Sequence, residues 1–387
     1  MAPRVIVGGG IARSPINAGG YTWAFLQYVL GFRQLGCEVL YVEHLDAKDC
    51  IDTDWQPVVF DRSANVAMFS ALSARYDLDG HAALLQREGD GSVGLSRRAV
   101  LEWAGSADLF VNLSGRFHLH EIMRGARRRV YVDLDPGFTQ IWQARYGVDM
   151  NLPGHDAYAT VGLNIGQPDC PVPTLDLPWR PLCPPVVRSQ WRPYGEPGEA
   201  GEAYTTVADW RGYAPIEWNG VWYKQKADEF LRFIEVAQRA PRPLEICLAI
   251  HPDEADLPRL QAHGWRLSDP AVYAADSETY RDYVRGSRGE FSVAKHGYVV
   301  GRTGWVSDRT ACYLAAGRPA VVQDTCLRAH LAVGEGMLVL AEPVDAVAAL
   351  EEVERDYPQH ARAAEALGAR YFDADRVLSD LLDIAGV

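Results

Sequence analysis

The most informative stretch of this 387-residue sequence is GWVSDRTACYLAAGRPAVVQDT, residues 304–325. After a glycine turn, Ser307 or Asp308 begins a helix, because short polar side chains accept hydrogen bonds from the free N–H groups of a first turn. The helix carries several alanines and stops at Gly317, and the apolar run 319–323 predicts a buried strand. A helix N-terminus that faces a cleft can hold a diphosphate.

The first half of the chain opens with a strand, a turn and a helix. RVIVGGG (4–10) predicts a buried strand that breaks at glycines, and 21–35 predicts a helix with one apolar stripe. Further apolar runs that predict strands follow at 38–45, 108–113, 129–134 and 158–163. Strands that are apolar on both faces are typical of a parallel sheet covered by helices.

A proline-rich stretch, residues 167–203, separates this half from the next. It contains nine prolines and three glycines, which suit neither a sheet ladder nor a helix interior. The second α/β pattern consists of strands at 204–209 and 244–250, helices at 224–239 and 254–263, apolar runs at 298–300 and 319–322, and a helical tail at 345–385. Two doubly wound domains leave a cleft at the carboxyl ends of their strands, which is the expected site.

The stretch 304–325 resembles the donor-binding half of GT-B glycosyltransferases, which transfer a sugar from a nucleoside diphosphate. The resemblance rests on an acidic residue on a small-residue helix, followed by AAGRP and a valine-rich strand. It continues in EFSVAKHGYV (290–299), GEG (334–336) and RDYPQHARAAEALGARYF (355–372). The likeness is strong over about 285–385 and weak in detail over the first half of the chain.

The resemblance implies an α/β fold of two Rossmann-like, doubly wound domains that face each other across a cleft. The C-terminal helices are expected to cross back to the first domain. We expect an acceptor-binding domain over 1–185, a linker over 186–203, a donor-binding domain over 204–365 and a returning helix over 366–387.

Composition narrows the classes of partner. The chain has 38 basic and 51 acidic residues, a formal net charge of −13, so we expect neither nucleic acid nor an anionic membrane surface as a partner. No apolar run has the length of a membrane span, and no secretory signal is visible. Seven cysteines without a CxxC pair fit a cytoplasmic protein without structural metal.

The glycines after the first strand leave a nicotinamide or flavin site as an alternative. Gly8 opens a triple glycine, and Glu43 at the end of the second strand could bind a ribose. A dinucleotide fingerprint would place glycine at the position of Arg13, and it expects the acid about 20 residues beyond the glycines. The fingerprint is therefore incomplete.

The resemblance also implies donor-binding residues in the second half. The expected donor contacts are Arg211, Lys295, Gly304, Trp305, Ser307, Asp308, Arg309, Asp324 and Thr325. Retaining members often carry two glutamates eight positions apart, but here Val300 stands at the first place and Asp308 at the second. Cys326 stands where the family commonly has glycine, which could narrow the donor-sugar pocket.

Catalytic and acceptor residues are expected from the first half. An inverting transfer needs a general base, and the candidates are Asp135, Asp133 and His118. The two aspartates stand at the carboxyl end of the predicted strand 129–134, whereas a structural role remains open for each of the three. The expected acceptor contacts are Asn17, Gly19, Gly20 and Phe138.

The sequence therefore predicts a metal-independent hexosyltransferase that needs no cofactor besides a nucleoside-diphosphate sugar. A small-molecule acceptor, as in natural product biosynthesis, is expected from the aromatic content. Alternatives are a nucleotide-sugar epimerase or hydrolase of the same fold, a GT-B-like binding protein without activity, and a Rossmann oxidoreductase. The oligomeric state, the base and the sugar stay open.

Overall fold

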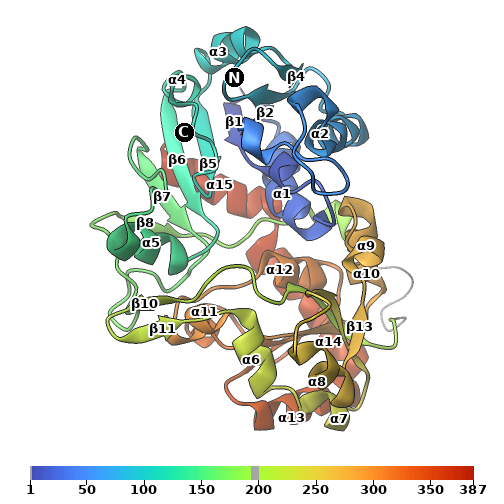
Figure 1. The fold of residues 1–387 in the computed structure, drawn as a ribbon. Coiled ribbons are helices and arrows are strands. Elements are labelled where there is room, and N and C mark those ends of the chain that lie inside the picture. Colours follow the sequence, from blue (N-terminus) through green and yellow to red (C-terminus); the bar gives the residue numbers. More distant parts are fainter. Residues whose placement is uncertain (1, 193–199) are drawn as a thin grey trace.

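The computed structural model describes residues 2–192 and 200–387. Two largely parallel sheets, each covered by helices, lie one above the other in Figure 1, the first in blue to green and the second in yellow to red. This arrangement confirms the predicted fold class of two Rossmann-like domains. Part of the predicted linker, residues 193–199, lies outside the described residues.

The first sheet has eight strands in the order β4-β3-β2-β1-β5-β6-β7-β8. Its strands are β1 (Arg4–Gly8), β2 (Glu38–Leu45), β3 (Ala82–Gln86), β4 (Ser92–Gly94), β5 (Leu109–Leu113), β6 (Arg128–Asp133), β7 (Ala157–Thr160) and β8 (Trp179–Pro181). Its helices are α1 (Gly19–Gln34), α2 (Ala64–Arg75), α3 (Arg97–Ala104), α4 (His120–Met123) and α5 (Phe138–Tyr146). β5 is buried along its whole length, as expected for a central parallel strand with helices on both faces.

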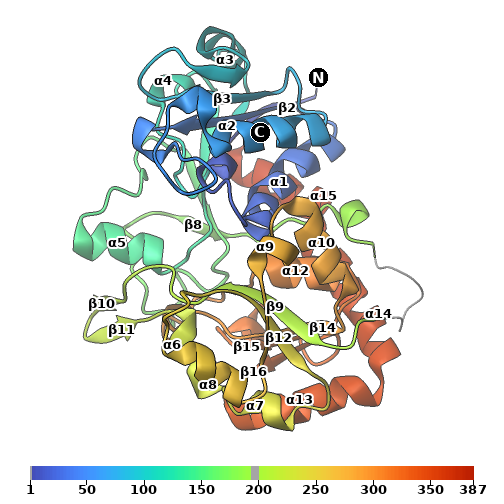
Figure 2. The same ribbon diagram turned by 45° about the vertical axis from the view of Figure 1, so that its right-hand side comes forward.

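The second sheet has six parallel strands in the order β13-β12-β9-β14-β15-β16. Its strands are β9 (Tyr204–Asp209), β12 (Leu244–Ala249), β13 (Arg266–Ser268), β14 (Gly289–Ser292), β15 (Ala320–Gln323) and β16 (Met337–Leu340), and a separate hairpin is formed by β10 (Ile216–Trp218) and β11 (Val221–Tyr223). Its helices are α6 (Lys226–Arg232), α7 (Val236–Arg239), α8 (Asp256–Ala262), α9 (Pro270–Tyr273), α10 (Ser277–Gly286), α11 (His296–Val300), α12 (Asp308–Ala315), α13 (Pro343–Arg355) and α14 (Tyr357–Leu367). Figure 2 shows α10 and α12 between this sheet and the upper half, next to α1.

The C-terminal helix α15 (Ala374–Ala385) crosses back to the first sheet, as predicted. The chain enters it through a π-helical turn, Gly368–Phe372, that follows α14. α15 packs so closely on α1 that a Cβ atom at Gly31 would lie 2.5 Å from Cδ1 of Leu378. None of the helices within the described residues is long and apolar enough to span a membrane.

Two predicted elements differ from the structure. The apolar run 298–300 belongs to helix α11, and the strand beside β15 is β14. The predicted helix 224–239 is broken between α6 and α7, where the Ile234 carbonyl accepts a hydrogen bond from Nε1 of Trp265 at 2.8 Å. This carbonyl is thereby engaged outside the helix, a tertiary contact that local periodicity does not reveal.

Candidate functional site

A cavity of about 810 Å³ lies where the carboxyl ends of strands from both sheets meet. From the first sheet it is lined by the loop after β1, including Asn17, and by Asp135 just beyond β6. From the second sheet it is lined by Asp209 at the end of β9, by Ile250 just beyond β12 and by the start of α12. Open parallel sheets commonly bind their ligands at this edge.

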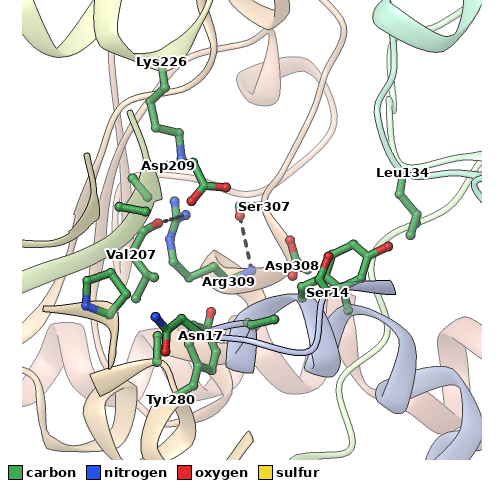
Figure 3. Close-up of a pocket in the computed structure, with 18 of the residues that line it drawn as sticks. Ser14, Asn17, Leu134, Val207, Asp209, Lys226, Tyr280, Ser307, Asp308 and Arg309 are labelled. Carbon is green, nitrogen blue, oxygen red and sulfur yellow. Dashed lines mark hydrogen bonds between the residues drawn. The ribbon is translucent and has the colours of Figure 1, made fainter. Parts of the chain in front are cut away.

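The N-terminus of α12 opens onto the cavity. Ser307 caps the helix, and its Oγ accepts a hydrogen bond of 3.2 Å from the backbone N–H of Arg309 (Figure 3). The Arg309 guanidinium donates to Oε1 of Glu290 at 2.8 Å, to the carbonyl of Val207 at 2.8 Å and to Oγ of Ser292 at 2.6 Å. These bonds fix the helix start against β9 and β14, so the positive end of its dipole faces the cavity.

Lys226, the first residue of α6, reaches into the cavity from the second sheet's side. Figure 3 shows its ammonium group beside the carboxylate of Asp209 and above Arg309. It makes no ion pair within 4.0 Å among the described residues. Burial, and then the like charges of Arg309 and Lys295, hold the pKa of Lys226 well below its ordinary value. An anion placed here would gain a cation that has no fixed carboxylate partner.

Asp308 follows the capping serine and lines the cavity. Burial raises the pKa of its carboxyl group, and the neighbouring Arg309 charge opposes that effect. Trp305 lines the same cavity and packs on Tyr298, with ring centroids 4.4 Å apart and the rings tilted by 30°. Asp308 and Trp305 therefore form the part of the cavity wall that continues from the helix N-terminus.

Asp135 joins the two halves of the molecule across the cavity. Nζ of Lys295 lies 3.2 Å from its Oδ1, and the Tyr213 hydroxyl donates to its Oδ2 at 2.8 Å. The Tyr298 hydroxyl also donates to Oδ1. Asp135 follows β6 of the first sheet, whereas Lys295, Tyr213 and Tyr298 belong to the second half. This partly buried cluster holds the carboxylate in one position.

Eight of the predicted site residues line the cavity. They are Asn17, Gly20, Asp135, Lys295, Trp305, Ser307, Asp308 and Arg309. The structure does not bring the other eight to the cavity: Gly19, His118, Asp133, Phe138, Arg211, Gly304, Asp324 and Thr325.

Asp133 and His118 have structural surroundings, which corrects their expected place beside the substrate. Asp133 is fully buried, and its carboxylate accepts hydrogen bonds from Thr139, Gln140, Thr160 and the backbone N–H of Asp135. Burial raises its pKa. These bonds hold β6, β7 and α5 together. The backbone N–H of His118 donates to Nε2 of His44 at 2.9 Å, and its ring stands edge-on to that of His44.

Arg211 and Asp324 have other partners than a donor nucleotide. Arg211 lies 2.9 Å from Oε2 of Glu254 and 2.8 Å from Oδ2 of Asp256, outside the cavity. Asp324 accepts hydrogen bonds from the backbone N–H groups of Cys326 and Leu327, at 2.9 and 2.7 Å. Both residues therefore stabilise loops of the second half, which corrects their assignment as donor contacts.

Gly304 and Thr325 do not line the cavity, and they join the segment before α12 to the segment after β15. The backbone N–H of Gly304 donates to the Thr325 carbonyl at 2.7 Å, and a Cβ atom at Gly304 would meet the Asn164 backbone nitrogen at 2.6 Å. The Thr325 hydroxyl donates to the Trp305 carbonyl at 2.7 Å. Cys326 has a φ of +87°, a conformation that favours glycine, and it does not line the cavity.

Gly19 and Phe138 are likewise used in packing. The backbone N–H of Gly19 donates to the Ala274 carbonyl at 2.9 Å, so it is not available to an acceptor hydroxyl. Phe138 is fully buried, and its ring packs on Tyr213 with centroids 4.9 Å apart. Phe138 therefore supports the residues that hold Asp135, without reaching the cavity itself.

Glu43 does not line the cavity either. It is fully buried under the turn Ile11–Arg13, where its Oε2 accepts the backbone N–H of Ala12 at 2.8 Å and its Oε1 accepts the Tyr41 hydroxyl. Burial raises the pKa of its carboxyl group to about 7. Glu43 thus holds the loop after β1, a role different from the ribose contact of the dinucleotide alternative.

Sequence reasoning missed several residues that line the cavity, above all Lys226 and Asp209. Others are Arg116, Asp269 and Tyr280. Lys226 lies in a predicted helix without a recognisable motif, and its place depends on where α6 begins relative to β9. No group of three or more histidine, cysteine or acidic side chains within the described part of the chain has the arrangement of a metal site.

No family model and no curated protein matches the sequence. The fold is nevertheless similar over the whole chain to solved glycosyltransferases. An α-glucosyltransferase in complex with UDP and a 13-mer DNA containing an HMU base has 12% identity, a TM-score of 0.58 and coverage of 100% of both chains. HepE from Anabaena in complex with UDP and glucose has 12% identity, a TM-score of 0.57 and coverage of 98% of this chain and 99% of that one.

A third similar structure is AviGT4, a glycosyltransferase involved in avilamycin A biosynthesis. It has 12% identity and a TM-score of 0.54, with coverage of 99% of this chain and 97% of that one. At such low identity these likenesses establish the fold alone. The chain has the GT-B fold that the resemblance implied.

The prediction that nucleic acid is not a partner is contradicted by the α-glucosyltransferase, a protein of the same fold that holds DNA. The prediction rested on the net charge of −13. A net charge averages over the whole surface, whereas a nucleic acid contacts one face, so the average does not exclude such an acceptor.

Proposed function

We propose that this chain, which has the GT-B fold, is a glycosyltransferase that moves a hexosyl group from a UDP-sugar to a small-molecule acceptor. The observation that carries the proposal is the meeting of Lys226 and the N-terminus of α12 in a cavity between the two sheets. A cation that makes no ion pair among the described residues and the positive end of a helix dipole together suit a diphosphate. Complexes of this fold with UDP support uridine as the nucleoside.

The donor lies across the second half in this proposal. The nucleoside occupies the end of the cavity beside Ile250 and Asp269, and the diphosphate lies between Lys226 and the start of α12. The sugar then lies next to Asp308, the first helical residue. The acceptor enters from the loop after β1, where Asn17 lines the cavity.

Asp135 is the one predicted catalytic residue that reaches the cavity, and we propose that it accepts the acceptor's proton. The charge that develops on the departing diphosphate is offset by Lys226 and the α12 dipole, so we propose that transfer needs no metal and no further cofactor. Turnover that survives EDTA is the expected result. The seven unpaired cysteines support the cytoplasm as the location, which cell fractionation tests.

A thermal-shift experiment with UDP, TDP, GDP, ADP and NADH tests the donor site. UDP should raise the unfolding midpoint, because a ligand that binds only the folded state stabilises it. Lys226→Gln should lose most of that rise. Lys224→Gln is the matched control, because Lys224 lies two residues away and does not line the cavity. A response to NADH alone would refute the proposal and favour the oxidoreductase alternative.

Turnover distinguishes transfer from the related activities. A transferase releases UDP from a UDP-sugar chiefly when an acceptor is added. An epimerase or hydrolase consumes the donor without one, and a binding protein leaves it intact. Screening UDP-glucose with a panel of small aromatic and sugar acceptors, and with an oligonucleotide, separates these outcomes and identifies the acceptor class.

A further inference from the structure

A small recess of about 40 Å³ opens from the wall of the main cavity. Ala24, Leu134, Trp305 and Asp308 line both spaces, so the recess begins where Asp308 faces the main cavity. The rest of its wall is mostly apolar and includes Val161, Pro184, Pro185 and Val306. A space of about 10–15 Å³ on this scale holds one water, so the recess has room for about three non-hydrogen atoms.

Tyr28 lines the recess and carries a buried polar atom that has no partner among the described residues. The hydroxyl group of Tyr28, on α1, is buried, and it has no hydrogen-bond partner in the structure. Burial and the nearby Asp308 charge raise the pKa of Tyr28 above its ordinary value, so the hydroxyl keeps its proton and can donate.

Among the other polar side chains of the wall, Gln27 is already engaged. Its Oε1 accepts the Val187 backbone N–H at 2.8 Å, and its Nε2 lies 3.7 Å from Sγ of Cys312. An unpaired buried hydroxyl costs stability, and a ligand group that bonds to it recovers that cost.

We propose that this recess binds the exocyclic hydroxymethyl group of the donor hexose, with Tyr28 donating a hydrogen bond to its oxygen. The inference rests on the proposed function, which places the sugar next to Asp308. The apolar walls suit the methylene carbon, and the Tyr28 hydroxyl suits the terminal oxygen. Tyr28 then sets specificity for hexoses over pentoses.

Two pairs of donors test this, since the members of each pair differ only by the hydroxymethyl group. They are UDP-glucose with UDP-xylose, and UDP-galactose with UDP-arabinopyranose. Binding is measured by calorimetry, with UDP alone as the reference. The wild-type protein should bind the hexose of at least one pair about tenfold or more tightly than its pentose partner, because a buried hydroxyl is left unpaired by the pentose.

Tyr28→Phe removes only the hydroxyl and should weaken hexose binding about five- to tenfold, with pentose and UDP binding unchanged. Ala24→Leu fills the recess and should likewise weaken hexose binding alone. Tyr131→Phe is the matched control, because its hydroxyl is also buried and unpaired but does not line the recess. It should leave all donors unchanged.

Equal binding of hexose and pentose by the wild-type protein in both pairs would overturn the recess assignment. So would an equal effect of Tyr28→Phe on hexose, pentose and UDP, because the recess would then hold only water or affect the fold in general. In both cases UDP binding itself is retained, and the proposed function stands. Failure of UDP to bind would instead refute the proposed donor site, and the recess assignment with it.

Discussion

Replacing Glu43 by glutamine should make the protein more stable at alkaline pH. Glu43 is fully buried, and its pKa is raised from 4.5 to about 7. The folded state therefore holds the proton more tightly than the unfolded state does. The protonated Glu43 carboxyl stabilises the folded state relative to the ionised one. This contribution is fully present below about pH 4.5, where Glu43 is protonated in the unfolded chain too, and it is lost as pH rises through about 7.

The magnitude follows from the difference between the two pKa values. The shift from 4.5 to about 7 corresponds to about 3.5 kcal/mol, since one pKa unit is worth about 1.4 kcal/mol. Glutamine cannot ionise, and its amide oxygen can still accept the Ala12 N–H that Glu43 binds at 2.8 Å. At pH 8 Glu43→Gln should therefore be more stable than wild type by about 1–3 kcal/mol, and at pH 4.5 the two should agree within about 1 kcal/mol.

Urea unfolding followed by tryptophan fluorescence between pH 4.5 and pH 8 measures this difference. The matched control is Glu38→Gln, at the exposed start of the same strand, where the carboxylate pairs with Arg4 at 3.1 Å. Loss of this surface pair should change stability by less than about 1 kcal/mol at every pH. If the stability curves of wild type and Glu43→Gln run parallel across this range, the reasoning about Glu43 is refuted.

Three further predictions concern the site and the packing of the halves. Because the pKa of Lys226 is lowered in the free protein, the protein should take up a proton when it binds UDP at alkaline pH, and its affinity for UDP should fall as pH rises. Calorimetry in buffers of different ionisation enthalpy measures this proton uptake, which Lys226→Gln should abolish. Asp135→Asn should lower acceptor-dependent kcat about a hundredfold or more while the Kd for UDP stays within about threefold; unchanged kcat removes Asp135 from the mechanism. Gly31→Ala should destabilise the protein by about 1–3 kcal/mol, because its Cβ would lie 2.5 Å from Leu378. The control Gly36→Ala places its Cβ in open space and should cost no more than the backbone strain of a φ of +83°. Equal urea midpoints for wild type and Gly31→Ala would contradict the close contact of α1 and α15.

The sequence correctly indicated elements whose signals are local. Ser307 caps α12, and Gly317 follows its end with a φ of +63°, because capping and left-handed turns depend on residues within a few positions. The parallel strands β1, β2 and β5 were visible for a similar reason, since burial on both faces leaves continuous apolar runs. The order of the two α/β patterns was enough to indicate the fold class.

Local signals failed where a partner from elsewhere in the chain decides the structure. The run 298–300 resembles a strand but belongs to α11. The helix predicted over 224–239 is broken between α6 and α7, where the Ile234 carbonyl accepts a hydrogen bond from Trp265. Asp133 and Asp135 stand two residues apart, yet one is buried under four hydrogen bonds and the other faces the cavity. Asp133 is the last residue of β6, whereas Asp135 lies in the turn beyond it, where strand alternation no longer sets the direction of a side chain; only the packing shows which of the two reaches the cavity.

By itself, then, the sequence determined the strands, the helix that opens onto the cleft and the two-domain fold, because these depend on short-range patterns of burial and turn chemistry. The tertiary structure alone decided which charged groups meet. It placed Lys226 opposite the start of α12, joined Asp135 to Lys295 across the two halves, and left the Tyr28 hydroxyl unpaired beside Asp308. The physical reason is that a site is made where distant segments converge, and the distance between two side chains in space is not written in their separation along the chain.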